Sequence, residues 1–363
     1  MRVLINAGPW LPVPPHGYGG IENVIATLVP PLREMGVEVV LASVGDSDLP
    51  VDEQVSAFGE GQFARLQEPY NRVCGIVPAH QHAVRRRLER GDIDVVHDHV
   101  EAAGLVTYPS DVRVLHTLHW DLTKHPALYG SLDAGPRLRV NGVSADQLTH
   151  APAALRAHAI GHVHLATPLA AVDSVRPAKG RHVVVLGRIT PGKGQDLAAR
   201  LAHEHGFDLV LAGPVGPYHR PEDLVIDSDN PDVRFWRAEV APHVDGRRVR
   251  WIGTVFGTER DELVATARAA LFPLHWNEPG GTAVVESLAL GTPVVGIARG
   301  CLPELVGHEH TGLLTSDEDE LGELVHKASA ISPDDCRAEA ARRFTPAVMA
   351  EHYLRLYEQV RSL

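Results

Sequence analysis

The sequence has little of what marks several classes of protein. Its three cysteines, Cys74, Cys301 and Cys336, are odd in number and lack C-x-x-C spacing, so neither a disulfide framework nor a structural zinc site is indicated. No run reaches 18 apolar residues, and we therefore expect no membrane span. The first residues are typical of a strand interrupted by polar side chains, not of a signal peptide.

Positive charge is also scarce. The chain has 34 Lys and Arg against 46 Asp and Glu, a formal net charge of −12 with histidine neutral. That balance opposes nonspecific binding to nucleic acid and makes an anionic membrane surface an unfavourable partner. The sequence predicts a soluble, cytoplasmic protein, and no feature of it indicates an oligomeric state. Histidine, by contrast, is abundant at 22 residues, which raises the question of a metal site.

The length of 363 residues exceeds the size at which one hydrophobic core usually stops growing, so we expect two domains. In the first half, apolar strand patterns alternate with helix-spaced apolar residues. This alternation predicts βαβ units and a parallel sheet covered on both faces. The expected strands are residues 2–7, 37–43, 94–97 and 113–119, and the expected helices are residues 21–34 and 79–88.

The pattern restarts in the second half, which places a domain boundary near residues 165–180. We expect strands at residues 182–186, 208–212, 249–253, 269–273 and 293–297, and helices at 196–204, 259–268, 283–290 and 346–361. Open parallel sheets bind ligands at the carboxyl ends of their strands. The predicted architecture is therefore two doubly wound domains facing each other across a cleft, with the ligand in that cleft.

The first motif runs from Gly187 to Gly194 and fits G-x-x-x-x-G-K between a strand and a helix. Gly194 stands where a magnesium-binding Ser or Thr would follow the lysine, which disfavours Walker-type nucleotide hydrolysis. A glycine-rich turn with two cations, Arg188 and Lys193, suits a diphosphate. The alternative is an ordinary strand–helix loop with solvated charges.

The second motif runs from Glu278 to Glu286 and contains Gly280, Gly281 and Thr282 at a predicted helix start. Free amides at a helix N-terminus favour an anion, and the two carboxylates suit sugar or ribose hydroxyls. The alternative is a helix cap with a surface glutamate.

A third glycine-rich turn, Gly17-Tyr18-Gly19-Gly20, precedes the first predicted helix. Its glycines allow the backbone to approach a ligand closely, although a flexible turn is the alternative. Glu22 stands where a nicotinamide-binding G-x-G-x-x-G motif has glycine, so the sequence gives that function little support.

Most histidines form local pairs, such as His97/His99 and His162/His164. Residues i and i+2 of a strand share a face, so His97 and His99 could in principle chelate a metal. No H-E-x-x-H helix occurs, however, and we expect no metal centre. His119, at the end of the fourth expected strand, is the histidine best placed for function, with His97, His99 and His116 as its neighbours.

A basic run, Arg85 to Arg87 with Arg90, lies on a predicted helix. Such runs are typical of a solvated helix face. The alternatives are contact with an anionic acceptor or with a membrane surface.

Taken in order, these segments resemble the retaining, nucleotide-sugar-dependent glycosyltransferases of family 4, which have the GT-B fold. The resemblance covers nearly the whole chain. Its most specific part is the E-x7-E spacing of Glu278 and Glu286, followed by Gly291-Thr-Pro and Gly300-Cys-Leu-Pro-Glu304. The chain departs from the family at Gly280, where many members have an aromatic residue, and near residues 166–168, where an Asn-Gly is usual. It looks most similar to members that act on bacterial natural products.

The resemblance implies that the chain has three parts. Residues 1–170 would be a Rossmann-like domain on the acceptor side, and residues 171–345 a Rossmann-like domain holding the nucleotide-sugar. Residues 346–363 would be a helix packing towards the N-terminal domain.

It also implies roles for particular residues. Arg188 and Lys193 would bind the donor diphosphate, and Glu278 would contact hydroxyls of the transferred sugar. The remaining donor contacts would come from both domains: Gly19, Gly20, His119, Gly280, Gly281, Thr282 and Glu286, the last holding the ribose.

The implied reaction is transfer of a sugar from an NDP-sugar, with UDP favoured, to a small-molecule or glycan acceptor with retention of configuration. It would need neither cofactor nor metal, because Arg188 and Lys193 supply positive charge. Same-face attack is favoured, with double displacement as an alternative. Other functions compatible with the fold are a nucleotide-sugar epimerase, a phosphorylase and a noncatalytic nucleotide-sugar-binding protein.

Overall fold

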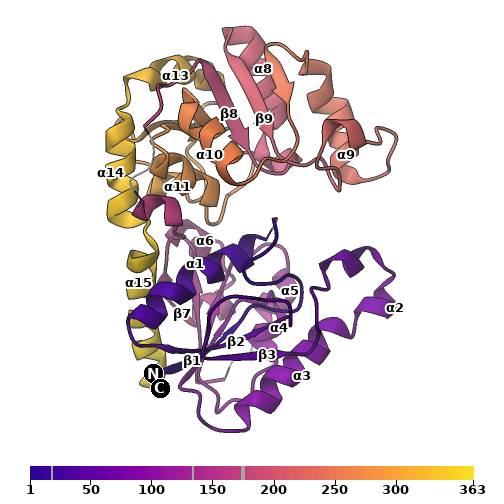
Figure 1. Ribbon diagram of the computed structural model, residues 1–363, viewed down its shortest axis with the longest axis vertical. Helices are drawn as coiled ribbons and strands as arrows, with labels where there is room; N and C mark the ends of the chain where they lie inside the picture. The colour runs from indigo at the N-terminus through magenta and orange to yellow at the C-terminus, as the bar shows by residue number, and fades with distance from the viewer. Residues whose placement is uncertain (18, 133–134, 173–175) are drawn as a thin grey trace. The chain divides into compact units, whose positions relative to one another are not determined.

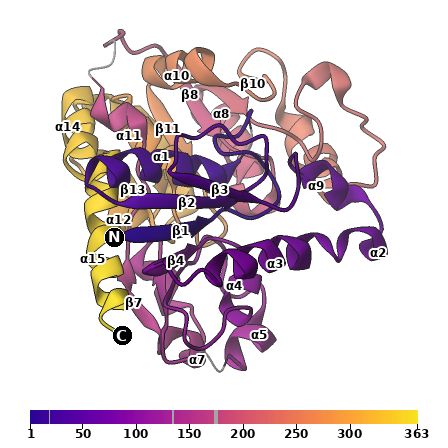
Figure 2. The ribbon, with the colours of Figure 1, turned by 60° about the horizontal axis from the view of Figure 1, so that its bottom comes forward.

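The computed structural model describes residues 1–17, 19–132, 135–172 and 176–363. Tyr18 of the third glycine-rich turn lies outside the described residues, as do residues 173–175 of the predicted boundary region. The chain divides into two compact units: unit 1 is Met1–Ala166 with Pro346–Leu363, and unit 2 is Thr167–Thr345. Figures 1 and 2 show the elements of each unit.

Unit 1 contains, within its described residues, a seven-stranded parallel sheet in the order β3-β2-β1-β4-β5-β6-β7. The strands are β1 (Arg2–Asn6), β2 (Glu38–Ser43), β3 (Glu53–Ser56), β4 (Val95–Asp98), β5 (Val114–Thr117), β6 (Leu138–Gly142) and β7 (Ala159–His162). The helices are α1 (Gly20–Glu34), α2 (Tyr70–Val73), α3 (Ile76–Leu88), α4 (Ala103–Val106), α5 (Pro126–Gly130), α6 (Ala145–Thr149), α7 (Ala153–Arg156) and α15 (Pro346–Arg361).

Successive side chains of a strand point to opposite faces of its sheet. In unit 1, apolar side chains on both faces are covered by helices. Val3 and Ile5 of β1 pack with α1 and with α15, whose Tyr353 and Tyr357 are fully buried. Leu4 packs on the other face, with side chains from α3, α4, α5 and α7. The C-terminal helix therefore belongs to the core of the first sheet.

Unit 2 contains, in the part of the chain that is described, a six-stranded parallel sheet in the order β10-β9-β8-β11-β12-β13. The strands are β8 (His182–Leu186), β9 (Asp208–Ala212), β10 (Val249–Trp251), β11 (Ala269–Phe272), β12 (Val294–Ile297) and β13 (Gly312–Thr315). The helices are α8 (Gln195–His205), α9 (Pro231–Phe235), α10 (Gly257–Thr266), α11 (Thr282–Ala289), α12 (Leu302–Leu305), α13 (Leu321–Lys327) and α14 (Pro333–Arg343).

Each sheet reverses its strand order once, beside its first strand. In unit 2 this topological switch point lies between β8 and β11, which pair directly. Ligands of doubly wound sheets bind outside the carboxyl ends of the strands at such a point. The loops that leave β8 and β11 are therefore where a ligand site is expected.

The predicted class, two Rossmann-like parallel-sheet domains, is confirmed. The sequence patterns missed β3, β6, β7 and β13, each of which has polar residues or glycine within or beside a short apolar stretch. None of the helices in the described parts of the chain combines the length and hydrophobicity of a membrane-spanning segment.

Candidate functional site

Lys193 and Glu278 form an ion pair between the two loops at the unit 2 switch point. Lys193 ends a short 3₁₀ turn, Pro191–Lys193, in the loop after β8, and Glu278 lies in the loop after β11. The Lys193 Nζ donates to Glu278 Oε2, and the two side chains are 26% and 16% exposed. The structure thus brings together two residues 85 positions apart that the sequence assigned to one site.

Glycine is required where these loops pass close to other backbone. Gly194 has φ of +71°, and a Cβ there would overlap the carbonyl oxygen of Pro273. Gly300 has φ of +60°, and a Cβ there would overlap the backbone of Glu278. The amide of Cys301 donates to the Glu278 carbonyl at 2.8 Å, which fixes the same loop from the other side. Larger residues at either glycine would move Lys193 or Glu278.

Trp276, which the sequence analysis missed, supports Lys193. The Lys193 Nζ lies 5.2 Å from the centroid of its indole ring, a cation–π distance. A Cβ on Gly192 would come within 3.2 Å of Trp276 Cγ, so glycine lets the loop lie against the indole. The signal was available: an aromatic residue stands two positions before Glu278.

Arg188, the second predicted diphosphate ligand, is exposed in the loop after β8. Its carbonyl accepts a hydrogen bond from Gln195 Nε2 at 2.9 Å, which anchors the main chain to the start of α8. Its guanidinium makes no ion pair with the described residues. Its charge is therefore available to an anionic ligand.

Glu286 lies on α11 and pairs with a cation that the sequence analysis did not single out. Arg260 Nη1 donates to Glu286 Oε1 at 3.1 Å, while the same guanidinium holds Asp261 at 2.7 Å. Burial raises the pKa of the Glu286 carboxyl, although Arg260 opposes the shift. The predicted sugar-binding residues Gly280 and Gly281 are buried just before α11, which begins at Thr282.

In unit 1, Gly19 precedes α1 and Gly20 is its first residue. A Cβ on Gly19 would meet Pro15 at 2.6 Å and Glu22 Oε2 at 3.2 Å, which explains the absence of a side chain there. Glu22 is only 6% exposed, and burial raises the pKa of its carboxyl to about 7. The sequence analysis treated Glu22 only as a break in a motif.

His97, predicted to neighbour the site, is a hydrogen-bonded core residue. Its Nδ1 lies 2.7 Å from the Tyr357 hydroxyl and its Nε2 lies 2.7 Å from the Thr117 hydroxyl. Both ring nitrogens are thus engaged. His97 therefore has no ring nitrogen free to chelate a metal together with His99.

His119 bonds to another histidine. His99 Nδ1 and His119 Nε2 are 2.8 Å apart, and burial lowers the pKa of His119 to about 4. His116 instead faces Asp98, with Nδ1 to Oδ1 at 3.4 Å, and burial raises the pKa of Asp98 to about 6. At neutral pH this end of the unit 1 sheet holds neutral imidazoles.

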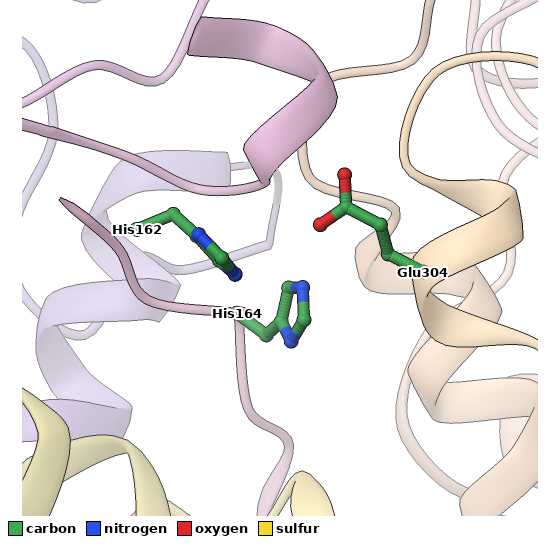
Figure 3. Close-up of side chains that lie close together, drawn as sticks. All are labelled: His162, His164 and Glu304. Atoms are coloured by element: carbon green, nitrogen blue, oxygen red, sulfur yellow. The ribbon is translucent and has the colours of Figure 1, made fainter.

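His162 and His164 form a second local histidine pair, at and just after the end of β7. Their ring centroids are 4.9 Å apart and the rings are tilted by 52°. Figure 3 shows both rings, together with Glu304 from α12 of unit 2.

The basic run on α3 is not the uniformly solvated face that was predicted. Arg87 is 2% exposed and binds Glu53 through Nε at 2.9 Å and Asp92 through Nη1 at 2.6 Å. Arg90 also pairs with Glu53. Arg86 is exposed and pairs with Glu89 at 3.6 Å, so only part of the run faces solvent.

The predicted residues therefore divide between the units. Unit 2 holds Arg188, Lys193, Glu278, Gly280, Gly281, Thr282 and Glu286, and unit 1 holds Gly19, Gly20 and His119. Among the described residues, unit 2 alone assembles a paired Lys–Glu centre, an arginine without an ion pair and a partly buried carboxylate on the loops and helix that follow its switch-point strands. That set can bind a diphosphate and several hydroxyl groups.

Two family descriptions match the chain. Residues 170–345 match "Glycosyl transferases group 1", and residues 18–141 match "Glycosyltransferase Family 4". Each match lies within one unit, the first in unit 2 and the second in unit 1.

Individual proteins are similar over most of their length. The D-inositol 3-phosphate glycosyltransferase of Actinosynnema mirum is 28% identical over 338 residues, covering 82% of this chain and 80% of its own. The crystal structure of AviGT4, a glycosyltransferase involved in avilamycin A biosynthesis, is 26% identical with a TM-score of 0.67 and covers 99% of this chain and 98% of its own. HepE from Anabaena, solved with UDP-glucose, is 16% identical with a TM-score of 0.68 and full coverage of both chains, a likeness of fold.

Proposed function

Because the chain belongs to the family 4 glycosyltransferases, which have the GT-B fold, we propose that it moves a sugar from a nucleotide-sugar to an acceptor hydroxyl and retains the anomeric configuration. The observation that carries the proposal is the Lys193–Glu278 pair, together with Arg188 in the same loop as Lys193, whose guanidinium pairs with no described carboxylate. Sugar transfer separates charge, and the departing nucleoside diphosphate is the negative product.

Lys193 and Arg188 stabilise that leaving group. An ammonium has three N–H donors, so Lys193 keeps donors for phosphate oxygens while one is used by Glu278. Arg188 adds a planar fork that matches two phosphate oxygens. Cations held in place by the fold stabilise developing charge with little reorganisation, which is how such groups lower a barrier. With two cations supplied by the chain, the reaction proceeds without a metal.

Glu278 accepts hydrogen bonds from hydroxyls of the transferred sugar. Its Oε2 is held by Lys193, which favours a positioning role over nucleophilic attack. Same-face attack, with the leaving phosphate taking the acceptor proton, therefore fits better than double displacement. Glu286, fixed by Arg260 through one oxygen, holds ribose hydroxyls through the other.

For the substrates, we favour UDP as the nucleotide and a natural-product precursor as the acceptor. AviGT4, similar along nearly its whole length, supports the acceptor class, and HepE, which binds UDP-glucose on the same fold, is consistent with the nucleotide. Gly280, where family members often carry an aromatic residue, would leave a wider sugar pocket.

The test begins with thermal stabilisation by a panel of nucleotide-sugars, with and without EDTA, followed by assays of transfer with the best donor. A ligand at a hundred times its Kd adds about 2.7 kcal/mol to the free energy of unfolding. Lys193→Ala and Glu278→Gln should retain the wild-type fold and lose transfer at least a hundredfold. Lys327→Ala, which removes an exposed lysine of unit 2, is the matched control and should be fully active.

Full turnover by the Lys193 and Glu278 variants would contradict the site. NMR of the product should show a retained anomeric centre, and inversion would reject the mechanism. Product formed without an acceptor would indicate an epimerase, dependence on inorganic phosphate a phosphorylase, and binding without turnover a noncatalytic protein.

A further inference from the structure

The His99 side chain has a single hydrogen-bond partner. It is fully buried, and its Nδ1 lies 2.8 Å from His119 Nε2, with the two rings stacked at 23° and 5.1 Å between centroids. The other nitrogen of His99, Nε2, is buried with no partner in the described residues. Buried polar atoms are usually hydrogen-bonded, so a buried imidazole with one unpartnered nitrogen needs a structural or functional reason.

The His99 ring is held in place by the His97 ring and by its own backbone. The His97 ring lies 4.1 Å away between centroids, and His97 is itself fixed by the hydroxyls of Tyr357 and Thr117. The backbone amide of His99 donates to the Asn6 carbonyl at 3.0 Å. The contact between His99 and His119 is therefore set by the sheet and by α15, not by a free rotamer.

Both imidazoles of this contact are neutral at physiological pH. Burial lowers the pKa of His99 well below its usual value and that of His119 to about 4. Two neutral rings in hydrogen-bond contact share one proton between them, so one ring donates and the other accepts. Which ring donates therefore decides which nitrogen of neutral His119 carries its one ring proton.

The two arrangements leave different groups buried. If His119 donated, His99 would carry its proton on Nε2, as a buried N–H with no acceptor. If His99 donates, only a lone pair at Nε2 is left unpaired. Buried N–H groups without an acceptor are rarer than buried acceptors without a donor, so donation by His99 is the favoured arrangement.

We infer that His99 is a positioning residue: its Nδ1–H donates to His119 Nε2 and thereby holds His119 as the Nδ1–H tautomer, with that N–H presented to the substrate. His119 Nδ1 bonds to none of the described residues and is not sealed from solvent. The inference rests on the proposed function and on the donor contact that the family resemblance implies for His119. It makes His119 a hydrogen-bond donor to a sugar or acceptor oxygen and removes it as a proton-accepting base.

The tautomer can be read without any substrate. Long-range ¹H–¹⁵N NMR of the full-length protein labelled with ¹⁵N-histidine distinguishes the two ring nitrogens, and His119→Asn assigns the signal. At pH 7.5 we expect His119 protonated at Nδ1 and His99 also protonated at Nδ1. A His119 signal protonated at Nε2 would overturn the inference.

Two variants separate the hydrogen bond from the space that His99 fills. His99→Asn keeps an N–H donor near the position of Nδ1, whereas His99→Leu keeps bulk and loses the donor. We expect His99→Leu to lower kcat about tenfold or more with the donor KM within twofold of wild type, and His99→Asn to restore kcat to within threefold. Equal activity of the leucine variant and the wild type would contradict the role.

The outcomes also separate this inference from the function on which it rests. Should no donor and acceptor give transfer, the proposed function fails, while the NMR spectrum of the wild type still decides the tautomer. Should His99→Leu fail to fold, the same spectrum and the asparagine variant decide it. A purely structural role for His99 predicts lost stability in the leucine variant without any change of the His119 tautomer in its folded fraction.

Discussion

The Lys193 ammonium lies over the indole ring of Trp276, 5.2 Å from its centroid, and the same indole packs on Gly192 of the loop that carries the lysine. This contact positions the cation that the proposed mechanism uses to stabilise the leaving group. A cation–π contact contributes roughly 0.5–2 kcal/mol, depending on burial.

Replacing Trp276 by Leu should therefore lower kcat/KM for the donor about threefold to tenfold, because Lys193 loses its support. Trp276→Phe keeps an aromatic face and should lie within about threefold of wild type. Steady-state kinetics of both variants, with melting temperatures to confirm folding, provide the check. If leucine and phenylalanine behave alike, the ring face has no role.

Glu22 should make stability fall as the pH rises. Its folded-state pKa of about 7 exceeds the ordinary value of 4.5, because burial penalises the ionised carboxylate. Between those two pH values the folded chain keeps a proton that the unfolded chain has lost, so the free energy of unfolding falls up to about pH 7 and then levels off.

Glu22→Gln removes the ionisation and should raise the free energy of unfolding above pH 7, by up to about 3 kcal/mol. Below about pH 5 the variant and the wild type should converge. Urea denaturation at a series of pH values measures the difference. Glu34→Gln, at the exposed end of the same helix, is the control and should change little at any pH. A constant offset for Glu22→Gln across the range would contradict the assignment.

Unit 1 should lose stability steeply in acid. Burial lowers the pKa of six of its described histidines: His80, His97, His99, His116, His119 and, in α15, His352. Below pH 6.5 the unfolded chain binds protons at these positions that the folded chain does not. Glu22 and Asp98, whose raised pKa values of about 7 and about 6 act in the opposite direction, offset part of the effect.

Near pH 5.5 the balance is an uptake of about three protons on unfolding, or roughly 4 kcal/mol of stability lost per unit of falling pH. Hydrogen exchange resolved by peptide reports each unit separately. Amides of β4 and β5 should lose protection between pH 6.5 and 5, whereas those of β8 and β9 should change much less. Equal losses in both sheets would show that the histidines are not responsible.

Arg87 should be far more important for stability than its neighbour in sequence. Its buried guanidinium neutralises Glu53 and Asp92 together, so Arg87→Met would remove the one buried cation among the described residues of this cluster. The two carboxylates would keep only the more exposed cations Arg2 and Arg90. We expect a loss of about 3 kcal/mol in the free energy of unfolding. Arg86→Met, at a side chain that is 69% exposed, should cost less than about 0.5 kcal/mol. Similar values for the two variants would contradict the buried-cation assignment.

The central strands of both sheets were predictable because short runs rich in apolar and β-branched residues favour a buried strand over a helix or a loop. Strands β8 and β9 consist largely of Val, Leu and Ala and were predicted with the bounds they have. Edge strands have a weaker sequence pattern. Strand β3, Glu53–Ser56, has only Val55 as an apolar residue and forms by pairing with β2. Its strand character comes from a neighbour, which a local pattern does not contain.

The candidate site likewise contains residues that the sequence predicted and residues that only the structure revealed. The motif spacing was enough to nominate Lys193 and Glu278 as ligand-binding residues. Glycines and charged residues together at the end of a buried strand contribute little to a core and are typical of a binding loop. Arg260 acts on a side chain distant in sequence, and no local pattern marks it. Trp276 stands two residues before Glu278, but only the fold places its ring against Lys193. His97 shows the reverse case: it was predicted to neighbour the site, yet its contacts with Tyr357 and Thr117 lie in the core.

The discontinuous make-up of unit 1 has a consequence for biosynthesis. Helix α15 fills the core of the first sheet with Tyr353 and Tyr357, but all of Thr167–Thr345 must leave the ribosome before that helix is made. At about 5–20 residues per second, the delay is roughly ten to forty seconds. Throughout that interval the apolar side of α1 has no helix beside it, while unit 2 can complete its own fold as it emerges. The nascent chain is thus a substrate for chaperones in its first half, and a stop codon near residue 345 would damage the half that was translated first.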